Sequence, residues 1–365
     1  MTNKNYENYK KLLIDTLGTV YPNYLKKKLI AQIANEGLII NSKKKSNSIN
    51  SSLLIDISEI EDVNDKLEHI LNFDNSNSIY KYIEEFEFNK SYRHSVIFES
   101  FNFNENKIPK LIEQGKLLLY RRDPSMNDYV DTNSVVPTIK ITDEEILIKF
   151  SYLLNNNNGY ELKPIKYVVL CRFDSNYKIL ELRFDKAPQG YQSTKDFYVD
   201  IVNLTISHLN SLFDVTIENI DFKGVIEYIR FIEDDNIYIY AMEMLRNGSK
   251  AYLDAMSNED MTIPILGEIK DFMLENEDLF SSNDETLQIK GKLNEFVENI
   301  QITSDLPSVK IVWPNNGIKV GIKHNYKDED FSLFMHYDEL IDSKERMDNV
   351  REYFIESYNN FKGQI

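Results

Sequence analysis

The sequence predicts an α+β fold, in which a small basic helical, winged-helix-like N-terminal module precedes a larger mixed body of antiparallel sheets with packed amphipathic helices. Apolar residues recur at helical spacing in some segments and alternate in others, so both kinds of element are expected. The 365 residues are 42% hydrophobic and 12% aromatic, which is enough to build a core. At about 150 residues per domain, we expect the module at 1–58, a mixed segment at 59–160 and the main body at 161–365.

Composition excludes several classes of protein. Cys171 is the only cysteine, so the chain cannot form an internal disulfide, and this residue cannot by itself build a zinc site. No apolar run approaches the roughly 20 residues that a membrane span needs, and the polar N-terminus lacks an apolar signal core. These features predict a soluble, cytoplasmic protein without a membrane partner.

The charge is distributed unevenly along the chain. Residues 1–50 contain nine lysines and three acidic residues, a net charge of +6, so the remaining residues carry −23 of the total of −17. Residues 254–305 are the most acidic stretch, with thirteen acidic residues against three lysines. A basic end on an acidic body indicates a polyanion contact at that end. The alternative is that both stretches are solvated faces.

The basic N-terminal module has a readable local structure. Its first helix ends at Gly18, and Pro22 suits the first turn of a second helix that ends at Gly37. Two short apolar runs, 38–40 and 53–57, then flank a polar loop and form a possible strand pair. Helix, helix, strand, basic loop, strand is the outline of a reduced winged helix, although the usual third helix before the strands is missing.

This outline identifies candidate nucleic-acid-binding residues. Lys27 and Lys28 would neutralise phosphates, and Gln32 and Asn35 are residue types that pair with adenine in the major groove. A lysine triplet in the loop would act as a wing tip over the backbone. The candidates are Lys26, Lys27, Lys28, Gln32, Asn35, Lys43, Lys44 and Lys45. The alternative is a small helical subdomain whose lysines are merely exposed.

The next hundred residues alternate between helix and strand. The periodicity predicts helices at 60–73, 79–88 and 107–114, and strands at 94–103, 117–120 and within 135–152. Asparagine and glycine interrupt both periodicities at 154–164, which is therefore expected to be a loop. Arg121-Arg122-Asp123-Pro124 could hold a phosphate, but its composition is more typical of a turn with a local ion pair.

A β-hairpin is predicted at 167–186, with its turn at Ser175-Asn176. Cys171 falls on its apolar face, so it is expected to be a small core residue rather than a nucleophile. The opposite face carries alternating charges, from Arg172, Glu181, Arg183 and Asp185. A solvated sheet face is the favoured interpretation of this pattern, and a phosphate or metal site is the alternative.

Helices and strands continue to the C-terminus. A helix is predicted at 193–212, opened by Ser193. His208 in this helix could be a general base, but a histidine at the margin of the core is the favoured interpretation. Strands are also predicted within 215–240 around an acidic turn, and a helix at 228–232 is the alternative for the first of them. The remaining predicted elements are helices at 264–275 and 285–302, strands at 309–313, 318–324 and 331–337, and a helix at 343–361.

Catalytic motifs are mostly missing from the sequence. It contains no P-loop, G-x-G-x-x-G, G-x-S-x-G or H-E-x-x-H motif, and the Asp221-x-Lys223 pair lacks the other residues of a nuclease site. One His/carboxylate cluster could suit a divalent metal, and it consists of His324, Asp328, Glu329, Asp330 and His336. Asp328-Glu329-Asp330 is ordinary turn composition, however, and the two histidines need not share a face, so a turn is the favoured interpretation. We therefore expect no catalytic residues, metal or cofactor, and leave enzymatic activity open.

The favoured hypothesis is a non-enzymatic accessory or regulatory subunit. Its basic module would contact nucleic acid, and its acidic body would bind a protein partner or a second copy of the chain. The abundance of Lys, Asn, Ile, Tyr and Phe is typical of AT-rich genomes, which suggests a bacterial or mobile-element protein and, by extension, antiviral defence. The alternatives are a metal-dependent hydrolase or nuclease, and a structural assembly protein with an acidic surface.

Overall fold

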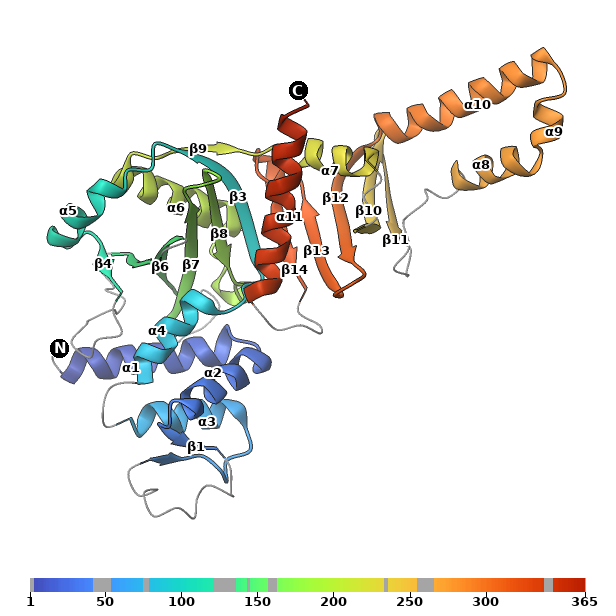
Figure 1. The fold of residues 1–365 in the computed structure, drawn as a ribbon. Coiled ribbons are helices and arrows are strands. Elements are labelled where there is room, and N and C mark those ends of the chain that lie inside the picture. The colour runs from blue at the N-terminus through green and yellow to red at the C-terminus, as the bar shows by residue number, and fades with distance from the viewer. Residues whose placement is uncertain are drawn as a thin grey trace. The chain divides into compact units, whose positions relative to one another are not determined.

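The fold is a mixed α+β structure with a large antiparallel sheet, which confirms the predicted class. The computed structural model describes residues 3–41, 54–74, 79–120, 136–142, 145–156, 163–232, 236–254, 266–337 and 344–364. The chain divides into two compact units, the first comprising 1–220 with 343–347 and the second 221–342 with 348–365. Figure 1 shows the elements and their labels.

The first unit begins with a helical module. Its elements are α1 (Asn3–Thr19), α2 (Asn23–Asn35), β1 (Ile39–Ile40), β2 (Ile55–Asp56), α3 (Val63–Asn72) and α4 (Ile79–Asn89). One apolar cluster joins all four helices, and it runs from Tyr9 in α1 to Phe86 in α4. The core of the module therefore extends beyond the predicted boundary at residue 58, because α1 and α2 share their apolar partners with α3 and α4.

The predicted strand pair of the module forms, but it is parallel. Ile39 pairs with Ile55 and Ile40 with Asp56 in parallel register. A wing is a hairpin, and the strands of a hairpin are antiparallel. The helices and strands therefore follow the predicted order in the chain, whereas this pair lacks the strand direction of a winged helix.

A sheet forms the rest of the first unit. Its strands lie in the order β3 (His94–Phe101), β8 (Ile179–Phe184), β7 (Ile165–Asp174), β6 (Ile146–Leu154), β5 (Thr138–Ile141) and β4 (Leu118–Leu119), and β9 (Thr216–Asn219) also pairs with β3. All of these pairs are antiparallel except β4 with β5. Since β6 and β7 are paired neighbours, the predicted boundary at residue 160 falls inside one sheet.

Helices pack on the two faces of this sheet. On one face, α6 (Phe197–Phe213) sets the ring of Phe197 against Tyr167, and Thr205 lies 2.9 Å from the hydroxyl of Tyr152. On the other, α1 and α4 contact β7. Short helices α5 (Ile108–Glu113), η2 (Glu105–Lys107) and η3 (Gln189–Tyr191) lie in the connections. The predicted start of α6 at Ser193 was four residues early, since the helix begins at Phe197 without a side-chain cap.

The second unit contains a second run of antiparallel strands. Its elements are α7 (Phe222–Phe231), β10 (Tyr238–Arg246), β11 (Ser249–Asp254), α8 (Leu266–Glu275), α9 (Glu277–Phe280), α10 (Asp284–Thr303), β12 (Asp305–Trp313), β13 (Ile318–Lys323), η4 (Tyr326–Asp328), β14 (Leu333–His336) and α11 (Lys344–Lys362), whose first turn belongs to the first unit. The strand order is β11-β10-β12-β13-β14. Phe354 of α11 packs edge-on against Phe334 and Phe222, so α11 and α7 cover the sheet together.

The C-terminal strands and helix confirm the sequence prediction, but two details of the second unit differ from it. Residues 228–232, expected mainly as strand, lie at the end of α7, because Asp221 accepts a hydrogen bond from the Gly224 N–H and starts a helix there. Strand β11 was not predicted. It follows a tight turn at Asn247 and Gly248, both with positive φ, and Asn-Gly is a strong hairpin signal.

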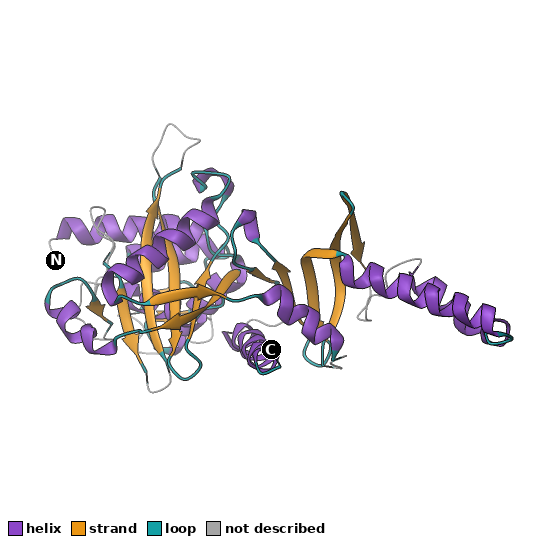
Figure 2. Cartoon of the chain, turned by 90° about the horizontal axis from the view of Figure 1, so that it is seen from above, coloured by secondary structure: helices purple, strands orange, loops and turns teal. Residues whose placement is uncertain are grey.

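Between β11 and β12 the chain forms a helical hairpin, which we call the acidic hairpin (residues 266–303). Figure 1 and Figure 2 both show α10 extending away from the strands of the second unit, and Figure 1 shows α8 and α9 beside it. Asn283 caps α10 by accepting hydrogen bonds from the N–H groups of Glu285 and Thr286, at 3.0 and 2.9 Å. Lys290 and Glu277 form an ion pair across the turn. The hairpin is thus held by its own contacts.

Candidate functional site

Helix α2 places four of the predicted nucleic-acid-binding residues away from the core. Its apolar stripe is buried, as predicted, and consists of Leu25, Leu29 and Ile33. Lys27 and Asn35 are exposed, and Lys28 and Gln32 are half-buried. Lys27 and Asn35 therefore lie where the core leaves α2 uncovered, and Lys28 and Gln32 lie at the margin of the buried stripe.

Lys26 lies inside the module instead. It is 4% exposed, and its ammonium donates hydrogen bonds to Asn64 Oδ1 at 2.6 Å and to the Gly18 carbonyl at 3.2 Å. Burial lowers the pKa of Lys26, and the nearby carboxylate of Asp62 partly opposes this effect. Because it shares the buried stripe with Ile30 and Ile33, Lys26 joins α2 to α3 and is not placed to meet a phosphate.

The lysine triplet of the predicted wing, Lys43, Lys44 and Lys45, lies outside the described residues, as does Arg121-Arg122-Asp123-Pro124. The described part of the interface is therefore the face of α2 formed by Lys27, Lys28, Gln32 and Asn35.

A network of buried charges joins α4 to the sheet. Lys149 of β6 and Lys166 of β7 each form ion pairs with both Glu84 and Glu87 of α4, and the four side chains are at most 3% exposed. The Lys166 ammonium lies 2.5 Å from Glu84 and 2.6 Å from Glu87. The hydroxyl of Tyr9 also donates to Glu84. Two positive and two negative charges thus compensate one another inside the first unit.

The pKa shifts of this network follow from its geometry. Burial acts to raise the pKa of Glu84, but the ammonium groups of Lys149 and Lys166 outweigh it and lower that pKa to about 2. Burial likewise acts to lower the pKa of Lys149, and the carboxylates of Glu84 and Glu87 raise it above its ordinary value. Glu84 and Lys149 therefore stay ionised at neutral pH, and the ion pairs of the network secure α4 against the sheet, so we assign the network a structural role.

The charged face of the β7–β8 hairpin is buried, which corrects the prediction of a solvated face. Its four charged residues, Arg172, Glu181, Arg183 and Asp185, are all at most 7% exposed. Arg183 contacts Glu181 at 2.8 Å, and Asp185 pairs with Lys90. The predicted alternation of charged and apolar residues along the two strands is confirmed. Partners from elsewhere in the chain, such as Lys90 and Glu145, neutralise the charged face.

Two residues weighed as reactive groups belong to packing, as predicted. Cys171 is fully buried, and burial raises the pKa of its thiol, so the nucleophilic thiolate is disfavoured. His208 is half-buried, with its ring stacked on Phe150 and Tyr152. Burial lowers its pKa, which favours the neutral ring.

The His/carboxylate cluster that was considered as a metal site does not assemble. His324 is buried, its Nδ1 lies 3.0 Å from the Ser332 hydroxyl, and burial, together with the charge of Lys223, lowers its pKa to about 4. Lys223 itself pairs with Asp305 at 2.8 Å. Among the residues that the structure describes, no three His, Cys, Asp or Glu side chains converge as a metal site would require.

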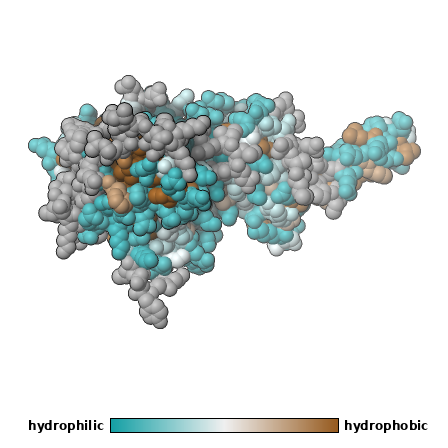
Figure 3. Space-filling model, turned by 90° about the horizontal axis from the view of Figure 1, so that it is seen from below, coloured by the Kyte–Doolittle hydropathy of each residue, from teal (hydrophilic) through white to brown (hydrophobic). Residues whose placement is uncertain are grey.

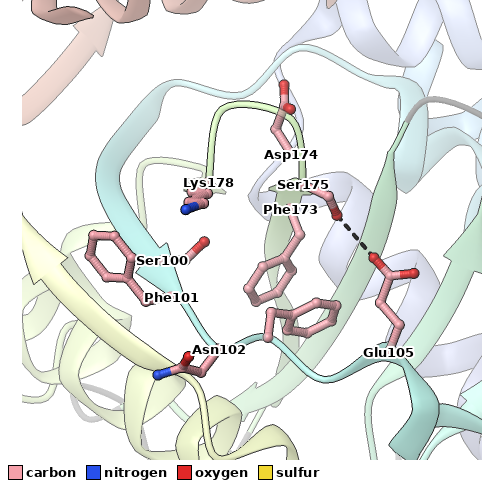
Figure 4. Close-up of a pocket in the computed structure, with 9 residues that line it drawn as sticks. Ser100, Phe101, Asn102, Glu105, Phe173, Asp174, Ser175 and Lys178 are labelled. Atoms are coloured by element: carbon pink, nitrogen blue, oxygen red, sulfur yellow. Dashed lines mark hydrogen bonds between the residues drawn. The ribbon is translucent and has the colours of Figure 1, made fainter.

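Sequence reasoning did not predict the cavities of the first unit. One, of about 330 Å³, lies where β3 ends beside the β7–β8 turn. Phe173 stacks there on Phe103 with ring centroids 4.1 Å apart, and Figure 4 shows the Ser175 hydroxyl bonded to Glu105, at 2.9 Å, at its edge. A larger cavity of about 650 Å³ has Arg93 in its lining, but Asp185 opposes that charge. Neither cavity gathers a recognisable set of catalytic groups.

The acidic hairpin exposes large apolar side chains. The six that are more than half exposed are Phe272 (58%), Leu274 (70%), Leu279 (66%), Leu287 (53%), Ile289 (53%) and Phe296 (55%). Figure 3 shows brown patches among teal residues at the end of the second unit that this hairpin forms. Its own core is small, with Leu266, Met273 and Val297 as its buried side chains among those described. This surface has the character of a docking site.

Comparisons with known proteins add no functional assignment. The chain matches no protein-family model, no curated protein and no solved structure. None of the helices in the described ranges combines the length and the apolarity needed to cross a bilayer.

Proposed function

We propose that the protein is a non-enzymatic accessory or regulatory subunit that contacts nucleic acid through its basic N-terminal module and binds a protein through its acidic body. The observation that carries the nucleic-acid contact is the surface of α2, where Lys27 and Asn35 are exposed and Lys28 and Gln32 are half-buried beside a buried apolar stripe. Lysines at its N-terminal end suit phosphate contacts, and the amides further along suit base edges. The bacterial or mobile-element setting is supported by composition alone.

The proposal is tested by gel shifts of the full chain with short DNA and RNA duplexes at several salt concentrations. With about four phosphates neutralised, the logarithm of affinity should fall against the logarithm of salt concentration with a slope of about −4. Replacing Lys27 and Lys28 with glutamine should weaken binding to all sequences and reduce the slope by about 2.

The matched control neutralises two exposed lysines elsewhere in the first unit, Lys110 and Lys116. This double variant has the same net charge as the Lys27/Lys28 variant, and it should bind with nearly the original slope. An equal loss of affinity in the two variants would show that the effect depends on net charge and not on α2. The absence of any gel shift at low salt would reject the nucleic-acid contact.

A further inference from the structure

The cavity of about 330 Å³ in the first unit is built where strand β3 and the β7–β8 turn meet. The pairing of β3 with β8 extends one residue into this turn, where the Ser100 N–H donates to the Lys178 carbonyl at 2.7 Å. Lys178 and Asn102 have φ of 54° and 60°, which is uncommon for residues other than glycine. These two left-handed residues end the turn and β3, and both line the cavity together with Ser100.

Aromatic rings form two walls of the cavity. Phe173 and Phe103 stack with ring centroids 4.1 Å apart, and the buried ring of Phe213 lies 4.9 Å from Phe103. Phe101 is half-buried, and Figure 4 shows its ring and that of Phe173 on opposite sides of Ser100. The space between them is therefore bounded by flat apolar surfaces that are already in place. Such walls suit a flat apolar ligand and reduce the entropy lost when it binds.

Two polar groups of the lining are available to a ligand. Among the described residues, neither the ammonium of Lys178 nor the hydroxyl of Ser100 has a hydrogen-bond or ion-pair partner. Lys178 is exposed, whereas Ser100 is 6% exposed, and a buried hydroxyl ordinarily has a partner. An anionic group lying between them would accept hydrogen bonds from both, one of them assisted by the charge of the lysine.

Two carboxylates also line the cavity, but each already accepts hydrogen bonds. Asp174 accepts from the N–H groups of Asn176 and Tyr177, both at 3.1 Å, and Figure 4 shows its carboxylate pointing away from the labelled phenylalanine rings. Glu105 accepts from the Ser175 hydroxyl at 2.9 Å. Their negative charges would repel a ligand with two negative charges more strongly than a ligand with one.

We propose that this cavity binds a small aromatic carboxylate, with its ring between Phe101 and Phe173 and its carboxylate beside Lys178 and Ser100. The volume of about 330 Å³ lies at the lower end of the range of small-molecule sites, so a single ring with a short acidic chain suits it. This ligand site goes beyond the proposed function and does not depend on it.

The test titrates the full chain with phenylacetate and follows binding by saturation-transfer NMR. Three matched compounds isolate the parts of the ligand: cyclohexylacetate lacks the flat ring, phenethylamine reverses the charge, and phenyl phosphate carries a second negative charge. We expect phenylacetate to bind with a Kd of about 1 mM or lower, and each of the other compounds to bind at least about threefold more weakly. Failure of phenylacetate to bind, or equal binding of any matched compound, would overturn the proposal.

Variants locate the binding. Lys178→Gln should weaken phenylacetate binding at least about threefold and remove the preference over phenethylamine, because the attracting charge is lost. Lys195→Gln removes an exposed lysine of the first unit that lies outside the cavity lining, and it should leave the affinity unchanged. Phe101→Leu keeps an apolar side chain but removes the flat ring, so it should abolish the preference for phenylacetate over cyclohexylacetate. Circular dichroism checks that the variants fold. Equal effects of the two lysine changes would reject the site.

Adenosine monophosphate tests a competing ligand, since aromatic side chains beside a lysine also bind nucleotides by stacking. If it binds more tightly than phenylacetate and this binding is lost in Lys178→Gln, the cavity belongs to a nucleotide and the proposed ligand class is overturned. Weaker binding supports the aromatic carboxylate. Gel shifts of the Lys27/Lys28 variant report separately on α2, so either proposal can fail while the other stands.

Discussion

Lys149 and Lys166 show how much can be predicted from a lysine that lies within an apolar strand. Each interrupts an apolar strand, and a lysine in such a strand needs a buried partner of opposite charge. The strand pattern identifies the face on which each side chain lies, but it carries no information about which segment covers that face. The partners Glu84 and Glu87 are more than sixty residues away in the chain, so this network could not be predicted from spacing.

Removing one charge from this network should cost much of the stability of the first unit. Glu84→Gln leaves Lys149 and Lys166 with one carboxylate between them, so we expect the free energy of unfolding to fall by about 3–5 kcal/mol. Urea unfolding at neutral pH measures the change. Glu61→Gln, at an exposed position, should change stability by less than about 0.5 kcal/mol. Equal stability of the two variants would contradict the structural role.

The same carboxyl predicts a pH dependence. The pKa of Glu84 falls from 4.5 to about 2 on folding, so the unfolded chain binds a proton more readily in this range. The stability that Glu84 contributes is therefore fully present above pH 4.5 and is lost as pH falls toward 2. Urea midpoints of the original protein should drop over this interval more steeply than those of Glu84→Gln. Parallel curves would show that other carboxyls dominate acid unfolding.

At the scale of elements, apolar periodicity predicted helices and strands correctly where a segment has one clear apolar stripe. The buried stripe of α2, the three C-terminal strands and α11 all lie near their predicted bounds, since each has a clear apolar period between strong turn or cap signals. The strand prediction for residues 228–232 was wrong, because a run of β-branched and aromatic residues suits both a short strand and a buried helix. The apolar stripe of α10 was predicted, but spacing alone does not show that Ile289 and Phe296 are exposed while Ile300 packs against Leu266 and Val297.

Replacing two glycines with alanine should change local stability in opposite directions. Gly248 has φ of +74° in the β10–β11 turn, so Gly248→Ala should destabilise that hairpin by about 1 kcal/mol. Gly291 lies within α10 with open space around it, so Gly291→Ala should stabilise the helix by about 0.5–1 kcal/mol. Hydrogen exchange followed by mass spectrometry should show faster exchange in β11 and slower exchange in α10, respectively. Changes of the same sign would contradict the two assignments.

At the scale of the whole molecule, composition predicts a basic module and an acidic body, whereas packing divides the chain at another position. The units meet in sequence near residue 220, whereas the predicted boundaries at 58 and 160 fall within one apolar core and one sheet. The distribution of charge along a sequence describes the protein surface. The boundaries between compact units depend instead on which apolar residues share a core. For the same reason, the sequence located the outward residues of α2 but did not identify Lys26 as buried.

Deleting residues 1–58 should therefore disrupt the first unit rather than remove an independent domain. The deletion would strip α1 and α2 from α3 and α4 and expose Ile70, Ile83 and Phe86, which are at most 2% exposed in the intact chain. It would also remove Tyr9 from the buried network. We expect increased binding of a hydrophobic dye and loss of soluble protein. A soluble truncated chain without such binding would show that the remaining helices hold their core alone.

The buried network also predicts how its four positions change together in evolution. A substitution that neutralises Lys149 or Lys166 leaves an uncompensated carboxylate in the interior, and neutralising Glu84 or Glu87 leaves an uncompensated ammonium. Such changes are tolerated only when a second substitution restores the balance. In descendants of this chain, the four positions should therefore covary, with α4 and the β6–β7 pair either retaining all four charges or exchanging them in opposite pairs for apolar residues.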